Sequence, residues 1–161
     1  MGEEDRALEL FEATLQENFH SVDEAFVSVY VRRGQRLLAV MIAAARFEPN
    51  SHAPVNEWIK AIEDPDGDHA ARLEHFEQWS RTTGIDYKWN SFILMAFKQY
   101  AMLRDYASTF QEVLWTEDAR AYRQTSYFQD YVRDVGILAF WQQQGFPAQC
   151  QAVGNDGFRC N

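Results

Sequence analysis

Apolar residues recur every three to four positions along most of the chain, which is the spacing of one face of an α-helix. The clearest stripe falls at i, i+3, i+4 and i+7 in Val55, Trp58, Ile59 and Ile62. Similar stripes predict about eight or nine amphipathic helices of 8–20 residues. In chain order, the predicted helices cover 4–18, a segment that starts near residue 21, 55–62, a segment from Leu73 that stops at Gly84, 90–104 with a continuation to Val113, 117–123, 126–135 and 137–144.

The segment 21–42 supports two interpretations. Ser21 and Glu24 form a capping-box pattern that predicts the start of a helix. The apolar residues between 37 and 42 also have helical spacing, with Gly34 either breaking the helix or packed inside it. Residues 27–31, however, alternate apolar and polar as in a strand, and a turn at Gly34 would then make a β-hairpin. The Ala-rich flanks favour helix, and the hairpin stays open.

Many short amphipathic helices with short joints predict an all-α fold, namely an antiparallel helical stack or tetratricopeptide-like α-solenoid. We expect a single domain over 1–161, with helical hairpins in 1–113 and a C-terminal capping segment in 114–161. The pattern Leu-Glu-x-Phe-Glu at 8–12 returns at 73–77, an offset close to two tetratricopeptide units. The tail after residue 146 is expected to be irregular and to dock through Phe146, Val153 and Phe158.

Residues 110–160 carry a more specific set of motifs. It comprises Leu114-Trp115, Tyr127-Phe128, Gly136-Ile137-Leu138-Ala139-Phe140-Trp141, Gly145-Phe146-Pro147-Ala148-Gln149-Cys150 and Phe158-Arg159-Cys160. This set resembles the C-terminal end of bacterial tetratricopeptide-repeat proteins of the kind fused to winged-helix or adenylate cyclase domains. The resemblance implies a terminal helical cap and an interaction role, and it implies no enzyme activity. The capping residues would be Trp141, Gly136, Gly145, Pro147, Cys150 and Cys160.

Composition and charge limit the classes of partner that the chain is expected to bind. Hydrophobic residues make up 47% of the chain and aromatic residues 15%, enough to bury a core. The net charge of −9 argues against direct binding of nucleic acid, which needs clustered Lys and Arg. No apolar run is long enough to predict a membrane helix, and residues 1–5 lack a signal-peptide pattern. We therefore expect a cytoplasmic protein in which Cys150 and Cys160 are reduced, although a bridge between them under oxidation remains open.

No pattern indicates catalysis or a cofactor. Asp64, Asp66 and Asp68 have the spacing of an EF-hand loop, but a histidine stands at each of two positions that the loop needs for Gly and Glu. His69 and His75 lie six residues apart, which does not place them on one helical face. Phosphate-binding, dinucleotide-binding and zinc-protease motifs are absent. We expect no catalytic residue, no metal and no cofactor.

The leading hypothesis is a non-enzymatic helical-repeat module for protein–protein interaction, a signalling or regulatory subunit in function. The expected partner-binding residues are Trp89, Tyr87, Glu57, Glu63, Asp66 and Asp68, with the acids selecting a basic protein. A homo-oligomer is predicted from the same reasoning, because an end repeat lacks a neighbour. Two alternatives remain: a small-ligand-binding protein or enzyme with a pocket between helices, and an acidic mimic of nucleic acid.

Overall fold

The computed structural model describes residues 5–6, 25–47, 52–106, 113–154 and 157–161. It divides the chain into two compact units, unit 1 over Met1–Ile85 and unit 2 over Asp86–Asn161. The expected helix over 4–18, the capping box at 21–24, the first copy of the Leu-Glu-x-Phe-Glu echo and the continuation from residue 104 to Val113 lie wholly or mostly outside the described residues. The single-domain organisation divided at residue 113 stays a prediction.

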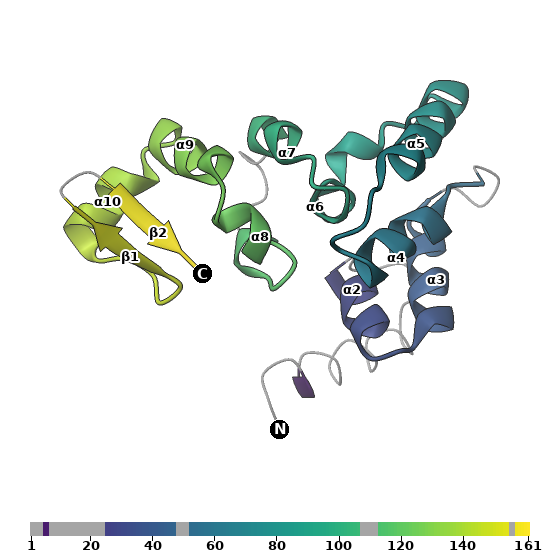
Figure 1. Cartoon of the computed structure of the whole chain (residues 1–161), viewed down its shortest axis with the longest axis horizontal. Helices are drawn as coiled ribbons and strands as arrows, with labels where there is room; N and C mark the ends of the chain where they lie inside the picture. The colour runs from purple at the N-terminus through teal and green to yellow at the C-terminus, as the bar shows by residue number, and fades with distance from the viewer. Residues whose placement is uncertain (1–4, 7–24, 48–51, 107–112, 155–156) are drawn as a thin grey trace. The chain divides into compact units, whose positions relative to one another are not determined.

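Unit 1 consists of helices in its described part (Figure 1). They are α2 (Ala25–Arg32), α3 (Arg36–Ala45), α4 (Val55–Glu63) and α5 (Ala70–Thr83). Helices α2, α3 and α4 pack against one another, and α5 contacts α4. The core is rich in aromatic residues: Trp58 and Phe76 are fully buried, and the Trp79 ring lies edge-on to that of Phe47 at 5.2 Å between centroids.

The segment that supported two interpretations is helical. Helices α2 and α3 are joined by a tight turn in which Gly34 has a φ of +73°, a left-handed conformation that costs glycine little. The backbone N–H of Gln35 donates a hydrogen bond to the backbone carbonyl of Tyr30 at 2.9 Å and closes the turn. Gly34 thus separates two helices, and the β-hairpin alternative for 26–42 is wrong.

The predictions for α4 and α5 are confirmed. Pro54 directly precedes the first residue of α4, and the stripe's Val55, Trp58 and Ile59 are buried. The acidic segment 64–68 ends α4, and Gly84, with a φ of +75°, ends α5. The end of α5 follows from local chemistry, since glycine adopts the left-handed conformation that commonly terminates a helix.

Unit 2 contains shorter elements and one hairpin. They are the 3-10 helix η1 (Tyr87–Trp89), α6 (Ser91–Ala96), α7 (Tyr100–Tyr106), the 3-10 helix η3 (Val113–Trp115), α8 (Arg120–Arg123), α9 (Ser126–Asp134), α10 (Ile137–Gln144), β1 (Cys150–Val153) and β2 (Gly157–Cys160). The last three helices match the predicted segments 117–123, 126–135 and 137–144 to within a few residues. Gly136, with a φ of +77°, links α9 to α10, as its place in the sequence indicated.

The prediction of a single helix over 90–104 is wrong. Asn90 caps α6 by accepting hydrogen bonds from the backbone N–H groups of Phe92 and Ile93, at 3.0 and 3.1 Å. The helix then ends at Ala96, and Lys98 takes a positive φ of 54° before α7 begins at Tyr100. The apolar run therefore folds as two short helices in contact, which lets side chains on several of its faces be buried.

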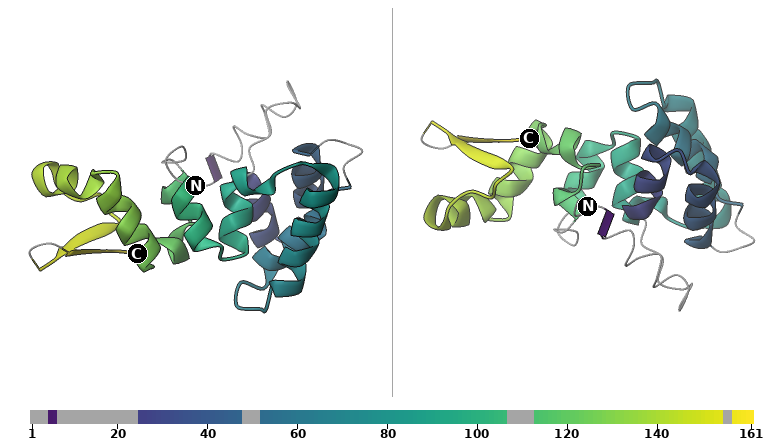
Figure 2. Two further views of the ribbon diagram at one scale, coloured as in Figure 1. Left: turned by 90° about the horizontal axis from the view of Figure 1, so that it is seen from above. Right: turned by 90° about the horizontal axis from the view of Figure 1, so that it is seen from below.

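The prediction of an irregular tail is also wrong, because residues 150–160 contain an antiparallel hairpin of β1 and β2 (Figures 1 and 2). Cys150 and Cys160 face each other in its register and form a disulfide, which corrects the expectation of reduced thiols. Phe158 is buried and docks the hairpin as predicted, and Phe146 joins the same aromatic cluster. Val153 was expected to dock as well, but it is 52% exposed.

The described part of the chain is thus largely helical, with one small disulfide-linked hairpin near its C-terminal end. In that part, every helix is too short or too polar to cross a membrane.

Candidate functional site

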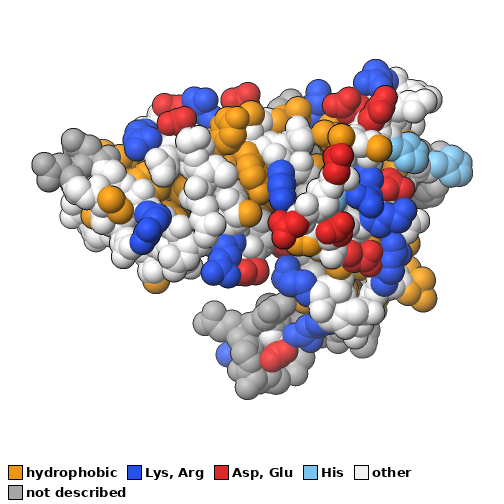
Figure 3. Space-filling model, in the orientation of Figure 1, with side chains coloured by type: hydrophobic (Ala, Val, Ile, Leu, Met, Phe, Trp, Pro, Cys, Tyr) orange, Lys and Arg blue, Asp and Glu red, His pale blue; other side chains and the backbone are white. Residues whose placement is uncertain are grey.

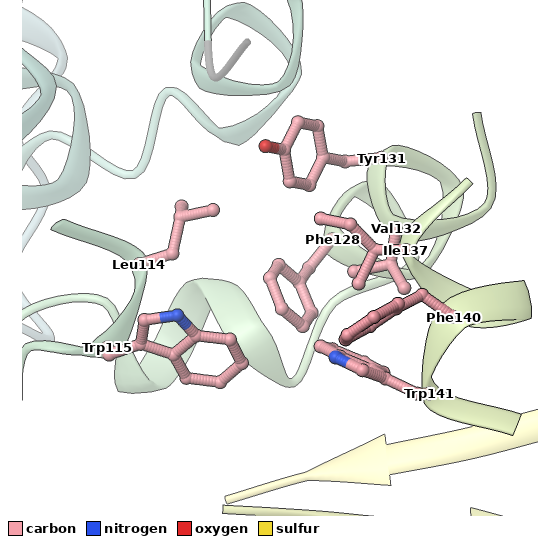
Figure 4. Close-up of a pocket in the computed structure, with 8 residues that line it drawn as sticks. All are labelled: Leu114, Trp115, Phe128, Tyr131, Val132, Ile137, Phe140 and Trp141. Carbon is pink, nitrogen blue, oxygen red and sulfur yellow. The ribbon is translucent and has the colours of Figure 1, made fainter. Parts of the chain in front are cut away.

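Unit 2 contains a partly open cavity of about 200 Å³. Three elements supply its lining, η3, α9 and α10, and the side chains that they contribute converge in Figure 4. These side chains are Leu114, Trp115, Phe128, Tyr131, Val132, Ile137, Phe140 and Trp141. We refer to this set as the aromatic pocket, since five of its eight members carry aromatic rings.

Local sequence rules place these side chains. Thr125 caps α9, because its hydroxyl oxygen accepts a hydrogen bond from the backbone N–H of Phe128 at 3.3 Å. Within α9 the lining residues Phe128, Tyr131 and Val132 fall at i, i+3 and i+4, so they share one face. On α10 the same spacing joins Ile137, Phe140 and Trp141. The left-handed turn at Gly136 connects the two helices.

The rings of the pocket continue into a buried aromatic cluster. Trp115 lies 6.0 Å from Trp141 and 6.3 Å from Phe128 between ring centroids. Phe158, on β2, lies 5.5 Å from Trp141 and 6.2 Å from Phe128. Most of these pairs are edge-to-face, the arrangement that ring quadrupoles favour. The pocket walls are therefore held from behind, partly by the hairpin.

The rim of the pocket is exposed and apolar. Phe140 is 61% exposed, whereas Phe128 is 1% exposed and Trp141 is buried. A large exposed ring beside an apolar cavity is the arrangement found where proteins bind apolar groups. Tyr127 and Val135 add further exposed apolar surface in unit 2 outside the pocket lining.

Arg123 is a buried cation behind the pocket. It is 5% exposed, and its guanidinium donates to the carbonyl oxygens of Leu114, Thr116 and Asn161, each at 2.8 Å. It also lies over the ring of Trp115, 6.0 Å from the centroid. Desolvation lowers the pKa of Arg123 from its ordinary value. The residue thereby joins α8, η3 and the end of β2.

The tyrosines in and behind the pocket are neutral. Burial raises the pKa of Tyr131, which lines the pocket, and also that of Tyr100. The same cause raises the pKa of Tyr122 further, and its buried hydroxyl has no hydrogen-bond partner among the described residues. The lining residues supply no carboxylate, imidazole or amine. The pocket is thus equipped to bind apolar groups and offers no acid–base pair.

The expected partner-binding residues are distributed over both units. Tyr87 is 1% exposed and belongs to the core of unit 2, and Trp89 beside it is half-buried. The four acids lie in unit 1 and take part in its own contacts. Glu57 pairs with Lys60 and Arg72, and Glu63 lies 2.9 Å from Arg36. The role of these residues stays a prediction.

Asp66 and Asp68, the remaining two acids, are exposed. Asp68 accepts a hydrogen bond from the backbone N–H of Ala70 at 3.0 Å, so it stabilises the start of α5. His69 is buried, with its Nδ1 2.9 Å from Arg72, and His75 is exposed. Within the described ranges, no three His, Cys, Asp or Glu side chains are grouped so as to hold a metal ion.

The expected capping residues all lie in unit 2, and several adjoin the pocket. Trp141 lines it, and Gly136 and Gly145 stand at the two ends of α10. The carbonyl of Pro147 accepts from the backbone N–H of Cys150 at 2.8 Å, which leads the chain into β1.

Sequence reasoning missed Arg123 and the exposed position of Phe140. One signal for Phe140 was present: Ile137 to Trp141 are five consecutive apolar residues on a short helix, which cannot all face one core. No local pattern pointed to Arg123, since its partners are carbonyl groups of distant residues.

Comparisons with known proteins were negative throughout: no protein-family model, no curated protein and no solved structure matches this chain.

Proposed function

We propose that this chain is a non-enzymatic helical module that binds another protein, which inserts an apolar side chain into the aromatic pocket. The tetratricopeptide-like stacking and the regulatory role inferred from the sequence belong to this proposal. The observation that carries it is the pocket itself, a cavity whose lining side chains are apolar or aromatic and which has an exposed phenylalanine on its rim.

The size of the cavity favours a side chain over a metabolite. Sites for drug-sized ligands generally occupy roughly 300–1,000 Å³. At about 200 Å³, the pocket matches a single large apolar group. Protein interfaces commonly concentrate their binding energy in such anchors, which fill desolvated pockets surrounded by weaker contacts.

Charge favours a basic partner. Unit 1 carries 16 acidic and 8 basic side chains, a net −8, whereas unit 2 carries 8 acidic and 7 basic ones, a net −1. On the face drawn in Figure 3, acids and bases lie close together over unit 1, in line with its ion pairs. The net charge therefore supports long-range attraction of a basic protein, and the apolar pocket supplies the anchor.

The test uses two lysine-rich peptides that differ at one central position, phenylalanine in one and alanine in the other. Binding is followed by NMR through the indole N–H signals of Trp115 and Trp141. We expect the phenylalanine peptide to move both signals and to bind more weakly as salt is added. Equal binding of the two peptides would refute the proposal.

A matched pair of variants localises the site. Phe140→Ala removes part of the rim, and burying the exposed part of such a ring contributes about 1–2 kcal/mol, so affinity should fall about 5–30-fold. Tyr127→Ala is the control, because Tyr127 is 42% exposed in the same unit but does not line the pocket. It should leave affinity unchanged, and equal losses in both variants would contradict a binding site at the pocket.

A small apolar molecule is the second candidate occupant, favoured by the concave shape of the pocket. Binding of such a molecule would be tighter than that of the peptide and insensitive to salt. The acidic-mimic alternative has no specific support, because Glu57 and Glu63 are engaged in ion pairs.

The remaining predictions concern assembly and location. Self-association stays a prediction, tested by light scattering. The cytoplasmic location was inferred from the lack of a signal-peptide pattern, and reduced thiols were expected as its consequence. The Cys150–Cys160 disulfide counts against this location, because such bonds persist mainly in oxidising compartments.

A further inference from the structure

Within the hairpin, strand β1 has few buried side chains to hold it in place. The hairpin comprises four residue pairs, from Cys150↔Cys160 to Val153↔Gly157. In β1, Cys150 is buried and the three residues after it are exposed. An isolated two-stranded hairpin is marginally stable in water, so the disulfide is a principal restraint on β1.

Two chains of contact lead from the hairpin to the aromatic pocket. In the first, Phe158 on β2 contacts Phe128 and Trp141, and both of these rings line the pocket. The strand ribbons run beside Trp141 in Figure 4. Displacing Phe158 would thus remove the support behind two walls of the cavity.

The second chain runs through Arg123. The backbone carbonyl of Asn161, the residue after Cys160, accepts a hydrogen bond from Nε of Arg123 at 2.8 Å. Arg123 in turn lies over Trp115, a third wall of the pocket. The hairpin therefore backs both tryptophans of the pocket, one through a ring contact and one through a buried cation.

From these contacts we infer that the Cys150–Cys160 disulfide controls the pocket, which is formed in the oxidised chain and loosened in the reduced one. A dithiol reductant supplies two electrons and two protons: the Sγ–Sγ bond breaks, both sulfurs become thiols, and the reductant becomes a disulfide. The loss of this restraint frees β1 and shifts Phe158, and the population of pockets able to bind falls. The consequence for partner binding rests on the proposed function, whereas the effect on the pocket does not.

The experiment compares the oxidised chain with a chain reduced by dithiothreitol and alkylated with iodoacetamide. Indole serves as a small apolar probe, and NMR follows the indole N–H signals of the tryptophans. On reduction we expect the signals of Trp115 and Trp141 to move, and those of Trp58 and Trp79 in unit 1 to stay. If the competent population falls to about a tenth, the apparent Kd for indole rises about tenfold.

Two variants distinguish a loss of coupling between the disulfide and the pocket from unfolding of the protein. The double variant Cys150→Ala, Cys160→Ala lacks both the bond and the alkyl groups, and it should behave like the reduced chain with its helical circular dichroism retained. Phe158→Leu with the disulfide intact should weaken indole binding in part, because it removes the ring contact alone. Unchanged Trp115 and Trp141 signals and an unchanged Kd on reduction would overturn the inference.

The results for indole and for the lysine-rich peptides test the inference and the proposed function separately. If the oxidised chain binds indole and loses it on reduction but binds neither lysine-rich peptide, the proposed function fails and the control by the disulfide stands. If indole does not bind the oxidised chain at all, the inference is overturned.

Discussion

Replacing Arg123 by alanine tests how unit 2 is held together. The guanidinium is buried and donates to three backbone carbonyls, those of Leu114, Thr116 and Asn161, each at 2.8 Å. Alanine would leave these acceptors without their donor and would remove the cation that lies over Trp115. The loss should reach η3, α8 and the end of β2 together.

The expected magnitude follows from these bonds. A hydrogen bond to a charged group contributes about 1.5–3 kcal/mol net, so three would suggest at least roughly 4 kcal/mol. Part of that is offset, because the folded chain no longer has to desolvate a cation, a cost that also lowers the pKa of Arg123. We expect the free energy of unfolding to fall by about 3 kcal/mol, a large fraction of the ~5–15 kcal/mol of an ordinary domain.

The assay is urea unfolding followed by tryptophan fluorescence. Arg120→Ala is the control on the same helix: its side chain is 57% exposed and pairs with Glu117 at 3.3 Å, so its loss should cost less than about 0.5 kcal/mol. Arg123→Lys should lie between the two, because one ammonium cannot reproduce the fork of the guanidinium. Equal stability of the Arg123→Ala and Arg120→Ala chains would refute the reasoning.

Two further substitutions probe the same unit by urea unfolding. Tyr122→Phe should keep or raise stability near neutral pH, by up to about 1 kcal/mol, because the buried hydroxyl has no hydrogen-bond partner among the described residues. Burial raises the pKa of Tyr122, so the folded state favours the neutral form of its side chain. The stability that this contributes is complete below about pH 10 and is lost as pH rises further. Between about pH 9 and 11, the Tyr122→Phe variant should therefore lose less stability than the unsubstituted chain. A steeper loss in the Phe chain would contradict this sign. Gly136→Ala should cost about 1–2 kcal/mol, since φ is +77° and an added Cβ meets no atom within 4 Å, so the cost is purely conformational. Gly136→Asn should cost less, and equal costs would argue against a conformational origin.

Helices were predictable from this sequence because their signals are local. The stripe of α4, the proline before it and the acidic turn after it all lie within about fifteen residues. The same holds for α9 and α10, which Gly136 separates. Periodicity, caps and glycines act over a few residues, so the chain itself displays them.

The break between α6 and α7 was not predictable in this way. Residues 90–104 are apolar nearly all round, and such a run shows no preferred face. The chain turns at Lys98, a residue type with no special preference for its positive φ. The two helices contact each other, and a sequence pattern does not report such contacts between elements.

The hairpin escaped prediction because each strand is four residues long and only three of its side chains are buried. Its register is set by a cysteine pair whose bonding depends on oxidation, which periodicity does not report. The presence of Phe146 and Phe158 correctly indicated that the tail docks. An irregular tail was predicted because nothing in the spacing of its residues indicates strands.

The aromatic pocket is built where sequence patterns are weakest. Its walls come from η3, which has no helical stripe, and from an α10 that is apolar on several faces. These elements are fixed by interactions between residues far apart in sequence, such as Arg123 with Asn161 and Phe128 with Phe158. Local rules commonly fail at functional sites, because function places side chains where local preference would not. The exposed ring of Phe140 is a departure of this kind. We therefore propose that binding be sought first at the pocket, before the acidic residues predicted in unit 1.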